Sequence, residues 1–476
     1  MKHQSKKVLT IICISLLLMS LAPRTAHGQQ IDSASDIDIS VIEGQQPILN
    51  SPGQLSAAGA VVIEQSTGKV LYGKYEDRRL YPASTTKILT ALLAAEYGDL
   101  DETIVVGEEI FLAALDGSKA GLEENEEITL RDLVYGLLIH SGNDAANTIA
   151  VHIARRVSEK NLPVEEAMEY FANMMNERAR KAGAQNSSFV NAHGYHDPGH
   201  YTTAYDLAMI GREAAKNEFF MEAVSTTAMN NTFWTSGAPR FWRSKNRLLK
   251  EDDSEYYEWA TGGKTGYTSA AGQCLVTFAS KDGLDLISVV LKSDPDMQWC
   301  ETRELLEYGF SNFRYHAVLE RGEIVETLPV DNYASDDWGS LAVQVSSDDW
   351  GDVFHKDDIP EIRREIIWEP SLLSEKSTQD LPRLKAPISK GQKIGELKVT
   401  LRGQVLKNVP LIAVRDVKRK DILDILTNQP GDGTPFGLSW LKFAGLAVSA
   451  LALIKIAVLF IKRRRRRRHY TIFRRY

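Results

Sequence analysis

Three short motifs, which occur in a fixed order, constrain the fold of this 476-residue chain more than any other feature of its sequence. They are Ser84-Thr-Thr-Lys87, Ser141-Gly-Asn143 and Lys264-Thr-Gly266. Each motif is weak evidence alone, because patterns this short recur by chance in a long chain. Each one nevertheless stands where the apolar pattern predicts a junction: a helix start, a loop between helices, and the start of a strand. Together they predict a mixed α+β fold in which helices and a sheet contribute to one site.

The first motif places a hydroxyl and an amine three residues apart. Apolar residues recur at helical spacing behind Ser84, so Ser84 and Lys87 should share one face at the start of a helix. A serine hydroxyl is a poor nucleophile until a base removes its proton. Lys87 can be that base if burial, or a nearby cation such as Lys264, keeps its amine neutral. The alternative, which is the default for this motif in isolation, is that Ser84 caps a helix and Lys87 is solvated.

The other two motifs carry groups suited to holding a peptide. Ser141 can relay a proton to a leaving amine, and the Asn143 amide offers both a donor and an acceptor to a peptide backbone. Lys264 and Thr265 can hold a carboxylate, and Gly266 leaves the edge of a strand open to substrate. The alternatives are a helix cap for the second motif and a plain turn before a strand for the third.

Between about residues 55 and 420 the chain resembles the D-alanyl-D-alanine carboxypeptidases, the low-molecular-weight penicillin-binding proteins, whose site carries three motifs of this kind. The stretches that carry the resemblance are 82–87, 141–145, 200–206, 246–249, 264–272 and, in the C-terminal part, 386–395. The resemblance implies a β-lactamase/transpeptidase-like domain, an antiparallel sheet with helices, followed by a small all-β domain. Residues 261–263 depart from the family pattern, because a more acidic or aliphatic approach to Lys264 is expected there.

The same resemblance implies a role for each motif residue. Ser84 would be the acylated nucleophile, Lys87 its base and Ser141 the group that shuttles the proton. The residues that would bind substrate are Asn143, Lys264, Thr265, Gly266 and Tyr267. Asn143 would bind the penultimate amide and Lys264 and Thr265 the terminal carboxylate, while the backbone N–H groups of Ser84 and Tyr267 would form an oxyanion hole. The implied partners are the peptidoglycan stem peptide ending in D-Ala-D-Ala and β-lactams as covalent inhibitors, and neither a cofactor nor a metal is expected.

Two other functions use the same motifs. A class A β-lactamase adds a Glu that activates the deacylating water, and Glu169 with Asn173 imitates that acidic motif. Both residues fall within a predicted amphipathic helix rather than an irregular loop, which counts against a β-lactamase. A non-catalytic β-lactam sensor would also be acylated at Ser84, but the basic tail at 462–476 is too short for a signalling domain. An enzyme of the carboxypeptidase kind is therefore the preferred interpretation.

The N-terminus has the pattern of a secretory signal peptide over residues 1–28. Lys2, Lys6 and Lys7 precede an apolar stretch of 14 residues at 8–21, and small residues follow at 26 and 28. The apolar stretch is too short to span a bilayer comfortably. An uncleaved anchor is the alternative.

The C-terminal region predicts a transmembrane helix at 443–461, a nearly continuous apolar stretch interrupted only by Lys455. Lys462 and six consecutive arginines follow at once, and such residues stay on the cytoplasmic side. The sequence thus predicts a single-pass protein of the cell membrane, with its catalytic domain on the extracytoplasmic side and a basic cytoplasmic tail at 462–476. The tail could also hold membrane lipid, although a plain stop-transfer signal is the favoured explanation.

The rest of the chain divides into three segments. Residues 55–315 are predicted to form the penicillin-binding carboxypeptidase domain, 320–420 the all-β domain, and 421–441 a linker that contains the Gly- and Pro-rich run 428–437. Hairpins are predicted for 59–64 with 69–75 and for 272–280 with 284–292. Helices are predicted after Ser84 and Thr129, and over 144–156, around 168–175 and over 300–310.

Charge and cysteine content narrow the class further. The chain has 56 Lys and Arg and 63 Asp and Glu, and 15 of the basic residues lie in 1–28 and 442–476, which hold no acidic residue. Residues 29–441 therefore carry a net charge of about −22, which argues against nucleic acid as a partner. Cys13 lies in the predicted signal. Cys274 and Cys300 could pair, but two free thiols are at least as compatible with the sequence.

Overall fold

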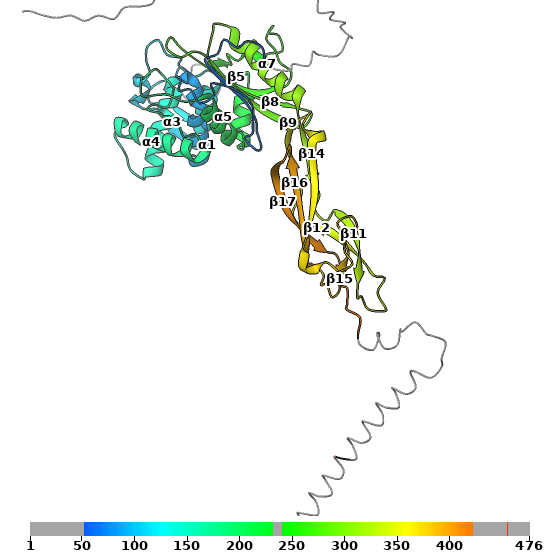
Figure 1. Ribbon diagram of the computed structural model, residues 1–476. Coiled ribbons are helices and arrows are strands. Elements are labelled where there is room, and N and C mark those ends of the chain that lie inside the picture. Colours follow the sequence, from blue (N-terminus) through cyan, green and yellow to red (C-terminus); the bar gives the residue numbers. More distant parts are fainter. Residues whose placement is uncertain (1–51, 232–239, 422–454, 456–476) are drawn as a thin grey trace, which may run out of the picture. The chain divides into compact units, whose positions relative to one another are not determined.

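The computed structural model describes residues 52–231, 240–421 and Lys455 (Figure 1). These residues form a part made of helices and a sheet, drawn from blue to green, and a β-rich part drawn from yellow-green to orange. The predicted signal peptide, most of the linker, the tail and, except for Lys455, the span at 443–461 lie outside the described residues. Among the residues that are described, no helix combines the length and the apolar character that crossing a membrane requires.

The first part is built on a five-stranded antiparallel sheet. Its strands, in the order in which they lie side by side, are β2 (Val70–Lys74), β1 (Gly59–Glu64), β9 (Leu284–Ser293), β8 (Gly272–Lys281) and β7 (Ala260–Thr268). The two predicted hairpins are confirmed, because β1 pairs with β2 and β8 pairs with β9 in antiparallel register. Strand β7 lies at an edge of the sheet, so one side of its backbone is not covered by a neighbouring strand of that sheet.

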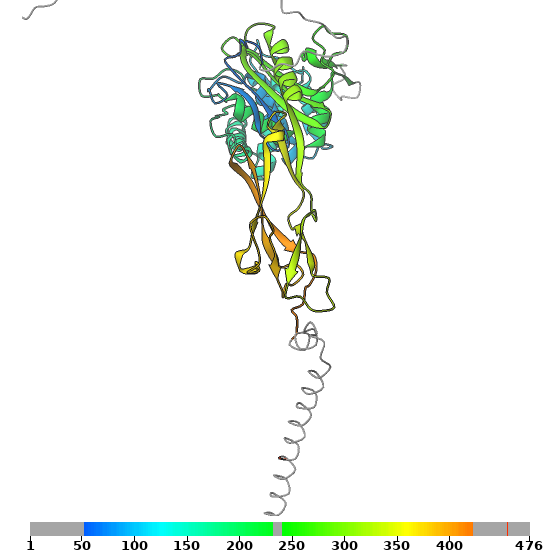
Figure 2. The same cartoon turned by 45° about the vertical axis from the view of Figure 1, so that its right-hand side comes forward.

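Both faces of this sheet are buried at its centre, which explains the long apolar runs in β1, β8 and β9. In β1, Val61 and Ile63 belong to one hydrophobic core and Ala60 and Val62 to another, as the two-residue period of a strand requires. Helix α5 (Ala204–Ala214) packs against β1 and β9 on the first face, and α7 (Met297–Asn312) packs against β9, β8 and β1 on the second. Figure 2 shows the sheet from another side, with helices on both faces.

The first core is extended by a group of helices. They are α1 (Lys87–Tyr97), α2 (Leu130–Leu138), α3 (Asn143–Ser158), α4 (Val164–Ala182) and α6 (Glu218–Ser225). The helices predicted from apolar spacing are all present. Helix α4 is longer than the predicted 168–175, because its buried face continues in both directions, from Val164 to Ala179. Helix α2 begins as expected, since the Thr129 hydroxyl accepts a hydrogen bond from the Asp132 N–H at 3.1 Å.

Short elements connect these helices. The two-stranded pairs are β3 (Thr103–Val105) with β4 (Glu127–Thr129), and β5 (Ala228–Asn231) with β6 (Arg240–Arg243). The 3₁₀ turns are η1 (Ala83–Thr86), η2 (Glu108–Leu112) and η3 (Arg247–Leu249). Cys274 and Cys300 are both free thiols.

The β-rich part begins at Phe313, directly after α7. A two-stranded pair joins β10 (Phe313–Leu319) to β13 (Trp350–His355). A six-stranded sheet has the order β14 (Ile362–Trp368), β16 (Lys393–Leu401), β17 (Gln404–Ala413), β12 (Ser340–Val345), β11 (Ile324–Asp331) and β15 (Leu384–Lys385). The turns η4 (Ile359–Glu361) and η5 (Pro370–Leu372) complete it. Its own core includes Leu341, Val343, Leu397 and Leu411, so the predicted all-β character is confirmed.

Candidate active site

The turn η1 presents Ser84 at the start of α1. Ala83 precedes Ser84 with φ +48°, an uncommon conformation for a residue with a side chain. The loop that carries Gly194 holds this turn in place. A Cβ on Gly194 would lie 1.8 Å from the Ala83 carbonyl oxygen, and the φ of Gly194 is +81°. Only glycine fits there, so the two segments fix the position of the Ser84 hydroxyl together.

Lys87 lies beneath Ser84 and is fully buried. Its Nζ is 2.9 Å from Ser84 Oγ, and it donates to Asn143 Oδ1 at 2.7 Å and to the His193 carbonyl oxygen at 2.9 Å. Burial, and next the charge of Lys264, hold the pKa of Lys87 well below its usual value. A neutral amine has two N–H groups, which here donate to the oxygens of Asn143 and His193. Its lone pair is then left for the hydroxyl of Ser84.

The second motif lies in the predicted loop between two helices. Ser141 has φ +64°, Gly142 is the N-cap of α3, and Asn143 is the first residue of that helix. The Asn143 side chain therefore reaches Lys87 from a helix N-terminus. The Asp144 carboxylate, which is buried, accepts hydrogen bonds from the backbone N–H groups of residues 120, 121, 122 and 145. This one side chain fastens the loop at 113–122 beside the site.

The third motif supplies a second buried amine. Lys264 Nζ donates to Ser141 Oγ at 3.0 Å and to the Thr265 carbonyl oxygen at 2.8 Å. Burial, and next the charge of Lys245, lower the pKa of Lys264 to about 7. The amines of Lys87 and Lys264 thus reach Asn143 and Ser141 respectively, and the three motifs meet as the sequence predicts.

The place of this motif within its strand differs from the expectation. Lys264 was predicted to open a strand, whereas β7 begins four residues earlier, at Ala260. Gly262 and Gly263 pair with β8 and are buried, and a Cβ on Gly263 would lie 2.6 Å from the Val276 carbonyl oxygen. The two glycines that depart from the family pattern at 261–263 therefore allow close packing of the strand. In the sequence a pair of glycines is more typical of a turn, so the strand was not predicted to begin before them.

Gly266 is the point where β7 approaches the Ser84 turn. A Cβ on Gly266 would lie 2.9 Å from the Pro82 carbonyl oxygen and 3.0 Å from the backbone nitrogen of Ser84. Tyr267 follows with its side chain 63% exposed, and Thr265 is half-buried. The backbone at Tyr267 therefore runs past the serine with no side chain between them.

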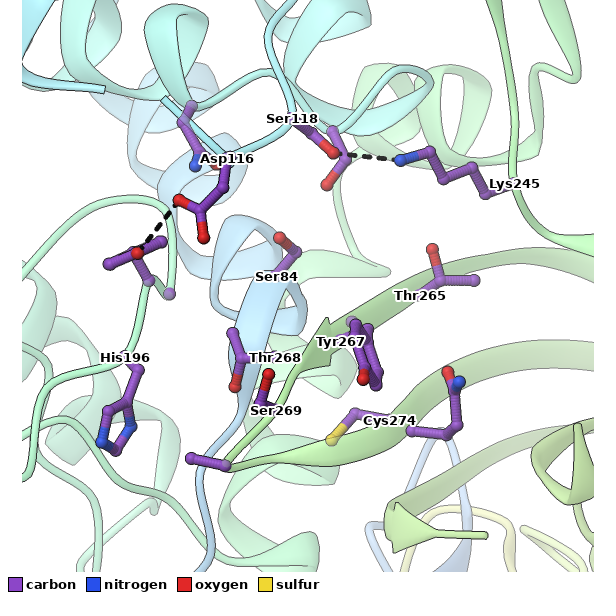
Figure 3. A pocket seen from close by; sticks show the side chains of 18 of the residues that line it. Ser84, Asp116, Ser118, His196, Lys245, Thr265, Tyr267, Thr268, Ser269 and Cys274 are labelled. Atoms are coloured by element: carbon purple, nitrogen blue, oxygen red, sulfur yellow. Dashed lines mark hydrogen bonds between the residues drawn. The ribbon is translucent and has the colours of Figure 1, made fainter. Parts of the chain in front are cut away.

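These residues open into a cleft of about 480 Å³. Ser84, Ser141, Asn143, Thr265, Gly266 and Tyr267 line it, together with several residues that sequence reasoning missed. Those include Asp116, Ser118, Tyr195, His196 and Lys245, most of which Figure 3 labels. Lys245 donates to Ser118 Oγ at 3.0 Å, and the Tyr195 hydroxyl donates to Asp116 Oδ1 at 3.1 Å. Lys245 directly precedes the recognised stretch 246–249, but nothing in the sequence pointed to Asp116 or Tyr195.

Over the residues that the structure describes, no group of three His, Cys, Asp or Glu side chains is placed to hold a metal ion. Two histidines stand near Lys87, of which His200 is buried and His193 half-buried. The pKa of His193 is lowered to about 3 and that of His200 to about 4, in both cases mainly by burial. His200 accepts the Val190 N–H at Nδ1, so its Nε2 donates to the Thr86 hydroxyl at 2.9 Å. Both rings are therefore neutral groups that support the η1 turn and its surroundings.

Comparison with known proteins shows the family of the chain. A family model for the D-alanyl-D-alanine carboxypeptidases matches residues 45–295, which is more than half of the chain. The chain belongs to the D-alanyl-D-alanine carboxypeptidase family. A second model, for the C-terminal domain of penicillin-binding protein 5, matches residues 313–419. The sequence-based identification of the family is confirmed, and so is the pairing of a mixed α and β catalytic part with an all-β part.

Individual members of the carboxypeptidase family show how far the likeness extends. The chain is 29% identical over 438 residues to D-alanyl-D-alanine carboxypeptidase DacF of Bacillus subtilis strain 168, covering 90% of this chain and 100% of that protein. It is 30% identical to the D-alanyl-D-alanine carboxypeptidase of Streptomyces sp. strain K15, covering 54% of this chain and 88% of that one. The crystal structure of penicillin-binding protein 5 from Haemophilus influenzae matches with a TM-score of 0.55 and 27% identity, over 78% of this chain and 99% of that chain.

The feature that imitated a class A β-lactamase lies outside this site. Glu169 and Asn173 are exposed on the continuous helix α4, as the amphipathic pattern predicted, and neither lines the cleft. The deacylating Glu of a β-lactamase must reach the acyl group in order to activate water there. The structure therefore offers nothing in favour of this alternative.

Proposed function

We propose that this member of the carboxypeptidase family removes the terminal D-alanine from peptidoglycan stem peptides through an acyl-enzyme on Ser84. The observation that carries the proposal is the amine of Lys87, which is buried, has a lowered pKa, and lies 2.9 Å from Ser84 Oγ. That distance is within reach for proton transfer, and the lowered pKa gives the neutral form that a base requires.

Acylation follows from this arrangement. Lys87 takes the Ser84 proton while Oγ attacks the carbonyl carbon of the penultimate D-Ala, and the backbone N–H groups of Ser84 and Tyr267 stabilise the resulting oxyanion. When the peptide bond breaks, the amine of the terminal D-Ala needs a proton, which Ser141 relays. Water then attacks the ester, and Ser84 recovers its proton as the shortened peptide leaves.

Substrate binding uses residues of the second and third motifs. The protonated amine of Lys264, together with the Thr265 hydroxyl, binds the free carboxylate of the terminal D-Ala. Asn143 binds the penultimate amide, and Gly266 lets the peptide lie along the open edge of β7. A β-lactam carries an equivalent carboxylate and a strained amide. It therefore acylates Ser84 in the same way and inhibits the enzyme.

We further propose that the enzyme works on the extracytoplasmic side of the cell membrane, after removal of a signal peptide at 1–28. The span at 443–461 would hold it as a single-pass protein in contact with membrane lipid, with the basic residues 462–476 inside. Residues 421–441 would be the linker between the β-rich part and the membrane. The support for this arrangement is the sequence pattern.

A direct assay tests the proposed reaction. Purified protein is incubated with a pentapeptide that ends in D-Ala-D-Ala, and released D-Ala is measured beside the Ser84→Ala variant. The wild type should release one D-Ala for each peptide and the variant none. Release of a larger fragment, or equal release by the Ser84→Ala variant, would overturn the proposal.

A further inference from the structure

The cleft has opposite charges on its two sides. Figure 3 shows Ser84 between Asp116 on one side and Lys245 on the other. Among the described residues that line the cleft, Asp116 is the only one with an acidic side chain. The amine of Lys264, where the proposed function places the terminal carboxylate of the substrate, lies on the side of Lys245, whose charge lowers its pKa. The negative side of the cleft is therefore left for a different part of the substrate.

Asp116 is exposed in a loop whose neighbouring residues are anchored, and one of its two carboxylate oxygens accepts no hydrogen bond from the described residues. Its neighbour Gly117 is packed against the site, because a Cβ there would lie 2.5 Å from Asn143 Nδ2. The same loop is fastened by the Asp144 carboxylate. The Oδ1 atom of Asp116 accepts the Tyr195 hydroxyl, while Oδ2 has no hydrogen-bond partner within the described ranges, and the residue is exposed. The Tyr195 hydroxyl thus binds one carboxylate oxygen of Asp116, and the other is available to a ligand.

Strand β7 sets the direction in which a bound peptide runs. A peptide that pairs antiparallel with the open edge of β7 and places its C-terminus at Lys264 must extend toward Thr268 with its N-terminal part. Thr268 and Ser269 lie on the side of the cleft away from Lys245, as does Asp116 (Figure 3). An extended chain advances about 3.3–3.6 Å per residue, so the residue before the D-Ala-D-Ala pair lies roughly 7 Å from the terminal residue in the direction of this side.

We infer that Asp116 is a specificity residue that favours peptides whose residue immediately before D-Ala-D-Ala carries an unblocked side-chain amine. The ammonium group would bind the free Oδ2, while the Tyr195 hydroxyl holds Oδ1 and so fixes the orientation of the carboxylate. The inference rests on the proposed function, because it assumes that the peptide carboxylate lies at Lys264. The inference adds the chemical class of the substrate residue that precedes D-Ala-D-Ala, which the three motifs do not determine.

A matched pair of substrates tests this inference with the full-length protein. Nα-acetyl-Lys-D-Ala-D-Ala carries the amine, and its Nε-acetylated form differs only in having that charge removed. The wild type should prefer the first by about 2- to 5-fold in kcat/KM, which is the range for an exposed ion pair. Asp116→Asn should bring the ratio close to one, and Asp116→Lys should invert it. Glu124→Gln, which removes an exposed acid that does not line the cleft, should keep the wild-type ratio.

Two further measurements separate the possible failures. Tyr195→Phe removes the hydrogen bond to Asp116 but keeps its charge, so it should retain a preference for the amine. If Tyr195→Phe abolished the preference as fully as Asp116→Asn although the carboxylate remains, the inference that the free Oδ2 of Asp116 binds the ammonium group would be overturned. Binding of both peptides to the Ser84→Ala variant, by calorimetry, reports the same ratio without turnover. If the wild type cleaved neither peptide, the proposed function would fail, but the ratio of the two binding constants would still test the role of Asp116. Equal binding of the two peptides would overturn the inference.

Discussion

Replacing Gly266 by alanine tests the close approach of β7 to the Ser84 turn. The new Cβ would lie 2.9 Å from the Pro82 carbonyl oxygen and 3.0 Å from the backbone nitrogens of Ser84 and Thr85. All three are backbone atoms, so no side-chain rotation can relieve the contact. Non-bonded atoms settle at about 3.5 Å or more, so β7 has to retreat by roughly 0.5 Å.

A retreat of this size separates the two backbone N–H groups that the proposed oxyanion hole needs, those of Ser84 and Tyr267. Misplacing catalytic groups by a fraction of an ångström to one ångström costs up to about 10²-fold in rate, so acylation should slow by roughly 10- to 100-fold. Overpacking at one position costs about 1–3 kcal/mol of the free energy of unfolding. The variant should therefore remain folded but react slowly.

The assay is the rate at which a fluorescent penicillin labels the protein, with Tm measured in parallel. Gly211→Ala in α5 is the matched control, because its Cβ would find no atom nearer than 3.6 Å. Alanine is the better helix former, so this control should acylate normally and be at least as stable as the wild type. A Gly266→Ala protein that acylated at the wild-type rate would refute the argument that the close approach of β7 positions the reacting groups.

Two other predictions concern the site, and a third concerns the membrane arrangement that the sequence pattern supports. A β-lactam should add one acyl group, located at Ser84 by mass spectrometry, and Lys87→Ala should slow that step by at least ~10²-fold; an adduct elsewhere would contradict the mechanism. Amidating the terminal D-Ala should cost about 1.5–3 kcal/mol, and this preference for the acid should fade as pH rises through about 7, where Lys264 loses its proton; equal cleavage at all pH values would show that Lys264 is misassigned. Protease added outside wall-stripped cells should cut within 421–441 and release an active fragment, whereas a fragment protected until lysis would reverse the proposed orientation.

Five of the described helices and two hairpins of this fold were accessible from sequence because their apolar patterns are regular, whereas α5 and α6 were not predicted. Apolar residues at helical spacing placed α1 to α4 and α7, and the turn signal at Asp282 and Gly283 placed the hairpin of β8 and β9. The start of β7 was missed because consecutive glycines are typical of turns, whereas here Gly262 packs against Val224 and Gly263 against Val276. Local sequence carries no information about such a close approach between backbones.

The site was predictable only as far as its motifs reach. Ser84, Lys87, Ser141, Asn143 and Lys264 could be named, because the chemistry dictates their types and spacing. Asp116, Tyr195 and Lys245 could not be found in this way, since they come from loops far apart in sequence that meet only in the folded chain. A lone Asp or Tyr in a loop has no pattern that distinguishes it from its solvated neighbours.

The two buried amines of the site also tie folding to proton release. In the folded protein the pKa of Lys264 is about 7, and the pKa of Lys87 is well below its usual value. When the chain unfolds, both pKa values return to the ordinary range near 10.5. Between those values the unfolded chain binds more protons than the folded one, so unfolding takes up protons and the free energy of unfolding rises with pH. Below pH 7 the Lys264 contribution levels off, because its amine is then charged in both states. The enzyme thus keeps its base neutral at the expense of stability at neutral pH, and it should resist unfolding better in mildly alkaline solution, up to the point where other groups begin to titrate.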